Sequence, residues 1–289
     1  LLLIPQDNVR EWYRYHNLFQ DLLLLRLRQS FKADHINDLH RRACTWYLSK
    51  DQIIDAIHHA FEVDDMPKIV KLIEGNIFTI LDKGELRRLK NWLSSIPRKY
   101  QVDHPWLHIA QALVLVYAGE LDLSEQALCL AEETLERLQS DELNQVMAYV
   151  YAIRAYSLWI NGSNEKSGEL ALQALSLGPK EEFALRAFTY MVLGASYIQR
   201  HASEEAIRAL NTSIDLAKKT GNEHIHILAS SHLVFLLINQ VKYSEAELIC
   251  QRILAQYENK KTRTSPAIAQ IFTLLSDIYT KRFQLDEAL

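Results

Sequence analysis

The stretch YMVLGASYIQRHASEEAIRALNTSIDLA, residues 190–217, contains two helical patterns separated by a short polar segment. In the first pattern, Tyr190, Leu193 and Tyr197 recur at helical spacing, which places them on one helix face. The small residue Ala206 follows nine positions after Tyr197, in the second pattern. A small side chain at this point lets two helices approach closely, because a bulkier one would push them apart. The stretch therefore predicts a helical hairpin.

The same hairpin pattern recurs along most of the chain. Small residues at equivalent points stand 39 to 42 positions apart; they are Ala127, Ser167, Ala206, Ala246 and Ala288. The order of an aromatic residue, Leu, a small residue and Tyr, followed by Ala on the next helix, resembles the tetratricopeptide repeat. That repeat usually has a period of about 34 residues and a closing Pro. Because the spacing here is longer and the Pro is missing, we expect longer second helices or turns.

Helical periodicity extends over nearly the whole sequence. Only 8 Gly and 6 Pro interrupt 289 residues, and alternating runs rich in Val, Ile or Thr are absent. Because one hairpin cannot bury its apolar face alone, neighbouring hairpins must stack. We therefore expect an all-α protein in which residues 101–289 form a tetratricopeptide-like right-handed superhelix. Residues 36–100 are predicted to form helical hairpins outside this register, including two helices near 36–49 and 51–63.

The composition excludes several classes of protein. With 48% hydrophobic residues, 24% charged residues and a net charge of -4, the chain is globular in composition and lacks the positive charge of a nucleic-acid-binding surface. The apolar run from Leu22 to Leu25 is soon broken by Arg26 and Arg28, so it is too short to cross a bilayer. We expect a cytoplasmic protein without membrane contact, whose three cysteines are reduced, buried thiols.

Motifs of catalysis and of cofactor binding are absent from the sequence. It contains no phosphate-binding GxxxxGK[ST], no dinucleotide-binding GxGxxG, no GxSxG nucleophile elbow and no HExxH metal motif. His104 and His108 could share a helix face, but Pro105 lies between them and no third ligand is evident. Surface or boundary histidines are the simpler interpretation. We expect no catalysis, no cofactor and no metal ion in this chain.

A superhelix of repeats usually binds its ligand on the concave face, which the first helix of each hairpin lines. Tyr149, Tyr156 and Trp159 stand at i, i+7 and i+10, so they share one stripe of such a helix. Aromatic side chains with polar neighbours in a groove suit a small molecule, a sugar or a peptide. Packing between repeats is the alternative role for these side chains. The candidate groove residues are Gln111, Tyr149, Tyr156, Trp159, Phe188, Met191, Ser231, Phe235 and Asn239.

Three N-terminal segments carry a distinctive order of residues. Residues 12–27 read WYRYHNLFQDLLLLRL, residues 39–74 contain HRRACTWY and DAIHHA, and residues 83–97 read KGELRRLKNWLSSIP. This order resembles the large bacterial ATP-dependent LuxR-type transcription regulators, the MalT-like signal-transduction ATPases. In the first segment we expect Leu18, Leu22 and Leu25, together with Phe19, to form the core stripe of a helix.

The resemblance implies an order of domains. In this family a nucleotide-binding module that takes ATP and a winged-helix region precede such a stretch, and a helix-turn-helix DNA-binding module follows the repeats. Residues 1–35 would then be the C-terminal part of the winged-helix region. ATP and DNA would bind only to modules outside these 289 residues. By the same resemblance, the superhelix would bind an inducer and bias the self-association that licenses transcription activation.

Two functions of the repeats therefore remain open. The first is a sensor that binds an effector within a transcription activator. The second is a generic tetratricopeptide-like scaffold whose groove binds a peptide or another protein. A ligand that stabilises the folded chain would distinguish a small-molecule sensor from a scaffold.

Overall fold

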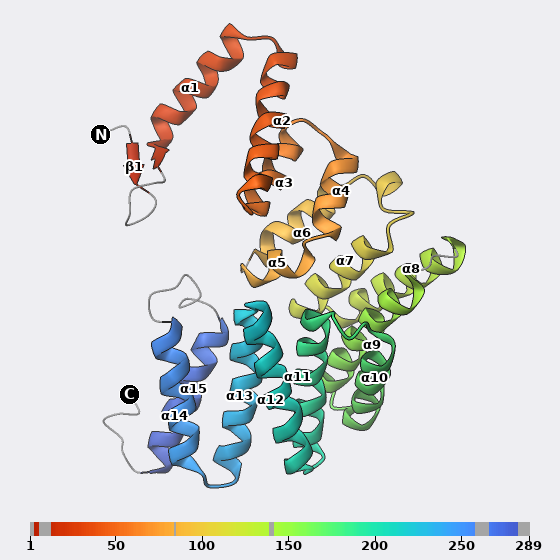
Figure 1. Ribbon diagram of the computed structural model, residues 1–289, viewed down its shortest axis with the longest axis vertical. Coiled ribbons are helices and arrows are strands. Elements are labelled where there is room, and N and C mark those ends of the chain that lie inside the picture. The colour runs from red at the N-terminus through yellow and green to blue at the C-terminus, as the bar shows by residue number, and fades with distance from the viewer. Residues whose placement is uncertain (1–2, 6–12, 84, 139–141, 258–265, 283–289) are drawn as a thin grey trace. The chain divides into compact units, whose positions relative to one another are not determined.

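The computed structural model describes residues 3–5, 13–83, 85–138, 142–257 and 266–282 of the chain (Figure 1). The chain divides into two compact units, residues 1–73 and residues 74–289. The described residues contain fifteen α-helices, one short 3-10 helix and two short strands. The predicted all-α class is therefore confirmed.

The first unit begins with a small β-hairpin that the helical periodicity did not predict. Strand β1 (Leu3–Pro5) pairs antiparallel with β2 (Tyr13–Tyr15), and Ile4 lies opposite Arg14. Helix α1 (Asn17–Ser30) follows directly after the second strand. Tyr13 and Tyr15 thus lie in a strand, and the helix that contains the predicted leucine stripe starts only after them.

The leucine stripe of α1 does not form a core within the described residues. Leu18 is 76% exposed, Leu22 50% and Leu25 53%, and α1 contains no buried residue. Phe19 is partly shielded and packs edge-on against Tyr15, with the ring centres 5.4 Å apart. The prediction of a core stripe is therefore wrong for this unit as described, because no described element covers the leucine face.

Helices α2 (Ala33–Ser49) and α3 (Ile53–Glu62) form the hairpin predicted near residues 36–63. A histidine contact joins them: Nδ1 of His40 lies 2.9 Å from Nδ1 of His59. The Tyr47 ring stacks on His59, with ring centres 5.3 Å apart. Helix α4 (Met66–Glu74) then spans the boundary between the two units.

The second unit consists of two short helices followed by four helical hairpins and a further helix. The hairpins are α7–α8, α9–α10, α11–α12 and α13–α14, and they pack in chain order as neighbouring antiparallel pairs (Figure 1). The elements are α5 (Ile77–Asp82), α6 (Leu86–Ser95), the 3-10 helix η1 (Arg98–Tyr100), α7 (Pro105–Tyr117), α8 (Leu121–Leu138), α9 (Leu143–Ile160), α10 (Asn164–Leu177), α11 (Phe183–Gln199), α12 (Ser203–Thr220), α13 (Glu223–Asn239), α14 (Tyr243–Tyr257) and α15 (Pro266–Lys281). This is the predicted tetratricopeptide-like superhelix.

The small residues predicted to let paired helices approach are buried. Ala127 is 3% exposed, and Ser167, Ala206 and Ala246 are fully buried; Ala288 lies outside the described residues. The Ser167 hydroxyl also donates a 2.7 Å hydrogen bond to the backbone carbonyl of Ala155 on the partner helix. The small-residue spacing therefore identified the contact line of each described hairpin.

Serines and a glycine reinforce the same contact line in other hairpins. The Ser124 hydroxyl donates to the Ala112 carbonyl at 2.9 Å, and the Ser213 hydroxyl donates to the Ala187 carbonyl at 2.7 Å. On α11, a Cβ atom at Gly194 would lie only 2.6 Å from Cγ of Leu210. A larger residue than Gly194 would therefore clash with Leu210 on the second helix of the hairpin.

Arg154 stands three positions after Tyr151, as Leu193 stands three positions after Tyr190 in the repeat described above. Its guanidinium binds Glu125 Oε1 at 2.6 Å and Glu132 Oε2 at 2.7 Å, both on α8. These hydrogen bonds, chiefly the one to Glu132, raise the pKa of Arg154. An ion-pair network therefore joins α8 to α9 at the position that Leu193 occupies in the third hairpin.

The four hairpin turns share one backbone geometry. In each, one residue adopts a left-handed conformation; these are Gly119 (φ 77°), Gly162 (φ 78°), His201 (φ 58°) and Val241 (φ 62°). The following amide reaches back across the helix end, as when the amide of Lys242 donates to the Leu237 carbonyl at 2.9 Å. This is the Schellman C-cap, which normally uses Gly because a side chain disfavours positive φ.

Replacing Val241 by Gly should stabilise the chain. Val241 is 69% exposed, so its side chain contributes little packing, whereas a β-branched residue at positive φ is strained. We expect Val241→Gly to raise the free energy of unfolding by about 1 kcal/mol. The reciprocal variant Gly162→Val, at a turn with open space around the Cα, should lower it by at least as much. Urea unfolding measures both, and equal stability of the three proteins would contradict this account of the turns.

Candidate ligand site on the concave face

An aromatic cluster lies where the first helices of all four hairpins converge. Its members come from α7, α9, α11 and α13, and apart from the buried Phe188 they are half-buried. We call this set the aromatic cluster; it consists of Tyr117, Tyr156, Trp159, Phe188, His224 and His232.

Tyr156 is the centre of the aromatic cluster. Its ring centre lies 6.0 Å from that of Tyr117, 5.6 Å from Trp159 and 5.5 Å from Phe188. Trp159 in turn meets the ring of His232 edge-on, with the centres 5.2 Å apart. Such aromatic pairs contribute about 0.5–1.5 kcal/mol each beyond their buried area. The cluster therefore joins neighbouring hairpins by direct ring contacts.

A contact between Tyr117 and His224 shows which face of the hairpin stack is concave. The two rings are perpendicular, with centres 5.6 Å apart, although α7 belongs to the first hairpin and α13 to the fourth. Side chains of helices that far apart can meet only on the inner side of a curved stack, since those on the outer side diverge. The aromatic cluster therefore lies on the concave face.

The cluster carries no charge at neutral pH. Burial lowers the pKa of His232 to about 4 and also lowers the pKa of His224, so both imidazoles are neutral. Burial raises the pKa of the Tyr156 hydroxyl, which stays protonated. The site thus offers aromatic faces with neutral hydrogen-bonding groups, an environment that suits an uncharged, partly apolar molecule.

The structure brings together three of the predicted groove residues and buries others elsewhere. Tyr156, Trp159 and Phe188 belong to the aromatic cluster. Tyr149, only 3% exposed, lies instead between the rings of Phe78 and Trp106, at 5.3 and 5.1 Å. Its position matches the alternative role as packing between helices.

A carboxylate holds the buried Tyr149 hydroxyl. That hydroxyl donates to Glu182 Oε1 at 3.1 Å. Burial, and then the Glu182 charge, raise the pKa of Tyr149 well above its ordinary value. Tyr149 thus has a fixed structural partner at the start of α11.

The remaining predicted groove residues are divided between the core and the surface. Met191 and Ser231 are buried, and the Ser231 hydroxyl donates to the backbone carbonyl of Ile227 at 2.9 Å. Phe235 and Asn239 are exposed on α13, and Gln111 is exposed on α7, where it lines a separate cavity. The nine residues therefore do not form one continuous surface.

Three members of the aromatic cluster were not predicted. Tyr117 stands at the end of α7, and His224 and His232 are eight positions apart on α13, which is a same-face spacing. His226, two positions after His224, does not belong to the cluster; its Nδ1 lies 2.7 Å from the Tyr257 hydroxyl. The same-face spacing of His224 and His232 was the available signal, but their contact with α7 and α9 is non-local.

The described residues show neither a metal-binding group nor a membrane-spanning helix. No three His, Cys, Asp or Glu side chains among them are grouped so as to hold a metal ion. None of the described helices combines the length and the apolar character needed to cross a bilayer. All three cysteines are free; Cys44 and Cys250 are buried as expected, whereas Cys129 is exposed beside Glu125 and Arg154.

Stacked helical hairpins with an aromatic concave face define a helical-repeat protein of the tetratricopeptide type. Residues 148–289 match the family model of the MalT-like TPR region. The chain is also 27% identical over 176 residues to the HTH-type transcriptional regulator MalT of Vibrio parahaemolyticus. This alignment covers 61% of the chain but only 19% of that relative. The chain therefore carries a MalT-like helical-repeat region and spans about a fifth of the relative's length.

Two solved structures share the fold. A signal transduction ATPase (STAND) protein with a tetratricopeptide repeat sensor from Pyrococcus horikoshii superposes with a TM-score of 0.65 at 16% identity, over 99% of this chain and 42% of that one. The apo form of RapI superposes with a TM-score of 0.50 at 14% identity, over 88% of this chain and 73% of that one. At these identities the likeness concerns the fold alone.

The low pKa of His232 predicts a loss of stability in acid. Below the unfolded pKa of about 6.5 the unfolded chain binds a proton at this residue while the folded chain does not, so stability falls as the pH drops from about 6.5 to about 4. At pH 5 the contribution of His232 should be about 2 kcal/mol. The variant His232→Phe, which keeps a ring but cannot titrate, should lose that share of the pH dependence. Denaturant unfolding at pH 7 and pH 5 measures it, and identical pH dependence in both proteins would refute the assignment.

Proposed function

We propose that the repeat region is the signal-sensing part of a transcription regulator and binds a small-molecule effector at the aromatic cluster. The MalT-like repeat match and the relative's description as a transcriptional regulator support the sensor role. The observation that carries the site is the convergence of side chains from four hairpins on one half-buried, uncharged cluster. A ligand there would contact several hairpins at once.

The chemistry of the cluster suggests the class of effector. Trp159 and Tyr156 offer ring faces, on which a sugar or another flat, partly apolar molecule stacks. The neutral imidazoles of His224 and His232 can donate or accept hydrogen bonds without requiring a charge on the ligand. We therefore favour an uncharged molecule that combines an apolar face with hydroxyl groups.

The concave face favours a small molecule over an extended peptide. The Tyr117–His224 contact joins the first and fourth hairpins on the concave face, so an extended peptide that spans the four hairpins on this face would meet these rings. A peptide would have to separate these rings, whereas a small molecule can bind beside them. The scaffold function, in which the groove takes a peptide or another protein, is the second candidate and gains no support from this contact.

Effector binding would act by shifting the curvature of the stack. An effector that prefers one spacing of the hairpins shifts the population toward it, and each 1.4 kcal/mol of preference changes the ratio about tenfold. In the longer protein that the MalT relative suggests, this shift would bias self-association. ATP and DNA would bind to modules outside the present residues, and transcription activation would follow from that assembly.

A thermal-shift screen tests the sensor function. We expect at least one member of a panel of mono- to tetrasaccharides and other uncharged metabolites to raise the melting temperature of the chain, because a ligand that binds only the folded state stabilises it. Trp159→Ala and Tyr156→Ala should each abolish that shift while the chain stays folded by circular dichroism. Phe272→Ala removes an aromatic residue of similar or greater exposure on α15 and should leave the shift intact.

Two outcomes would count against this function. If the shift persists in both Trp159→Ala and Tyr156→Ala, the ligand binds elsewhere and the aromatic cluster is packing. If no panel member shifts the melting temperature but a peptide library does, the scaffold function is correct.

A further inference from the structure

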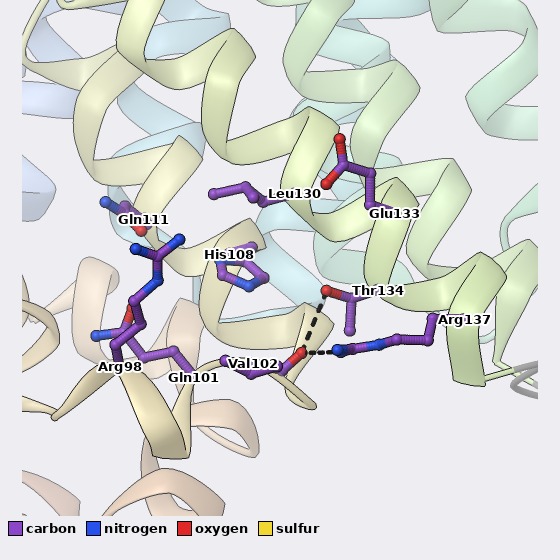
Figure 2. A pocket seen from close by; sticks show the side chains of 9 residues that line it. All are labelled: Arg98, Gln101, Val102, His108, Gln111, Leu130, Glu133, Thr134 and Arg137. Carbon is purple, nitrogen blue, oxygen red and sulfur yellow. Dashed lines mark hydrogen bonds between the residues drawn. The ribbon is translucent and has the colours of Figure 1, made fainter.

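A separate cavity lies at the start of the superhelix, between α7 and α8 and beneath the turn that follows η1. It has a volume of about 420 Å³, within the range of small-molecule sites. Figure 2 shows His108 at its middle, with Arg98 and Gln111 to one side, Leu130 directly above the ring and Glu133 to the other side. The cavity shares no residue with the aromatic cluster.

His108 is the unusual residue of this cavity. It is only 7% exposed, and its Nδ1 atom has no hydrogen-bond partner among the described residues. Leaving a buried polar atom unpaired costs about 1–3 kcal/mol, so such an atom needs an explanation. The sequence predicted a surface or boundary histidine here. That is correct for His104, which binds Glu74 Oε1 at 3.1 Å, but wrong for His108.

Burial keeps the His108 ring neutral. It lowers the pKa of His108, and the nearby positive charge of Arg137 lowers it further. At neutral pH the ring therefore offers one donor and one acceptor rather than a charge. Such a group can pair with a hydroxyl, an amide or an amine of a bound molecule.

One wall of the cavity is held by internal contacts. Arg137 donates to the backbone carbonyl of Val102 and pairs with Asp103 Oδ1 at 2.9 Å. The Thr134 hydroxyl also donates to the Val102 carbonyl at 3.4 Å (Figure 2). These contacts tie the turn after η1 to α8 and compensate the Arg137 charge. The cavity thus has a preformed shape, which reduces the cost of binding.

Two opposite charges in the cavity are uncompensated. Arg98 and Glu133 are both exposed, and neither forms an ion pair or a side-chain hydrogen bond with another described residue. They lie on opposite sides of His108, Arg98 next to the Gln111 amide and Glu133 on α8 (Figure 2). A positive and a negative group facing one small cavity are complementary to a molecule that carries both charges.

We propose that this cavity binds a small zwitterion, such as a free amino acid or a dipeptide. The carboxylate of the ligand pairs with the Arg98 guanidinium and Gln111, and its ammonium group pairs with Glu133. A polar atom in between satisfies His108, and Leu130 covers the apolar part. The site is independent of the effector site at the aromatic cluster and gives the repeat region a second input at its first hairpin.

Calorimetric titration of the 289-residue chain tests this site. The probes are the common L-amino acids, γ-aminobutyrate and glycylglycine, each also as the N-acetyl form without the ammonium and as the amide without the carboxylate. We expect at least one zwitterion to bind and both of its modified forms to bind about 10-fold or more weakly, because each lacks one charge-assisted hydrogen bond. Arg98→Gln and Glu133→Gln should weaken binding by a similar factor.

Matched control variants distinguish binding in the cavity from a general effect of surface charge. Lys99→Gln removes a neighbouring positive charge on η1, and Glu136→Gln removes a neighbouring negative charge on α8; neither residue lines the cavity, so neither should change the affinity. The proposal is overturned if no probe binds, or if Arg98→Gln and Lys99→Gln have equal effects. If Trp159→Ala abolishes zwitterion binding, the ligand occupies the aromatic cluster; the cavity site is then wrong, and the cluster is a ligand site but not one restricted to uncharged molecules.

Discussion

Close approach of the two helices in each hairpin is the constraint on which the rest of this structure depends. Ser167, Ala206 and Ala246 are fully buried on that contact line, and Gly194 has no room for a Cβ atom against Leu210. The small side chains bring the backbones close enough for serine hydroxyls to reach carbonyls on the facing helix. Each hairpin thereby becomes a stiff unit, and stacking of such units produces the curved array.

The candidate sites follow from that array rather than from any single motif. Curvature brings Tyr117 on the first hairpin against His224 on the fourth, and the rings between them form a cluster that spans all four hairpins. The cavity around His108 instead lies within one hairpin and the turn that precedes it. A ligand at the cluster would change the curvature of the array. A ligand at the cavity would change the first hairpin and the turn that precedes it.

The sequence predicted the local features of this protein better than the distant ones. Helical spacing and the small residues are local signals, so the hairpins and their contact lines were predicted correctly. The turn at Val241 carries no glycine, yet it adopts the same left-handed geometry as Gly119, because the helix end rather than the residue type imposes it. The Tyr117–His224 contact joins residues far apart in the chain, and the local periodicity of the sequence cannot predict such a contact. The ion pairs of Arg154 are also non-local, because both glutamates that bind it lie on the neighbouring helix α8.

A double-mutant cycle on Tyr117 and His224 measures whether ring contacts across the concave face hold the curvature of the superhelix. Unfolding free energies are measured for Tyr117→Ala, His224→Ala, the double variant and the unaltered chain. We predict a coupling energy of about 0.5–1.5 kcal/mol between the two residues, because each single variant already removes the shared contact. Strictly additive effects would show that the first and fourth hairpins do not support one another, and would contradict the account.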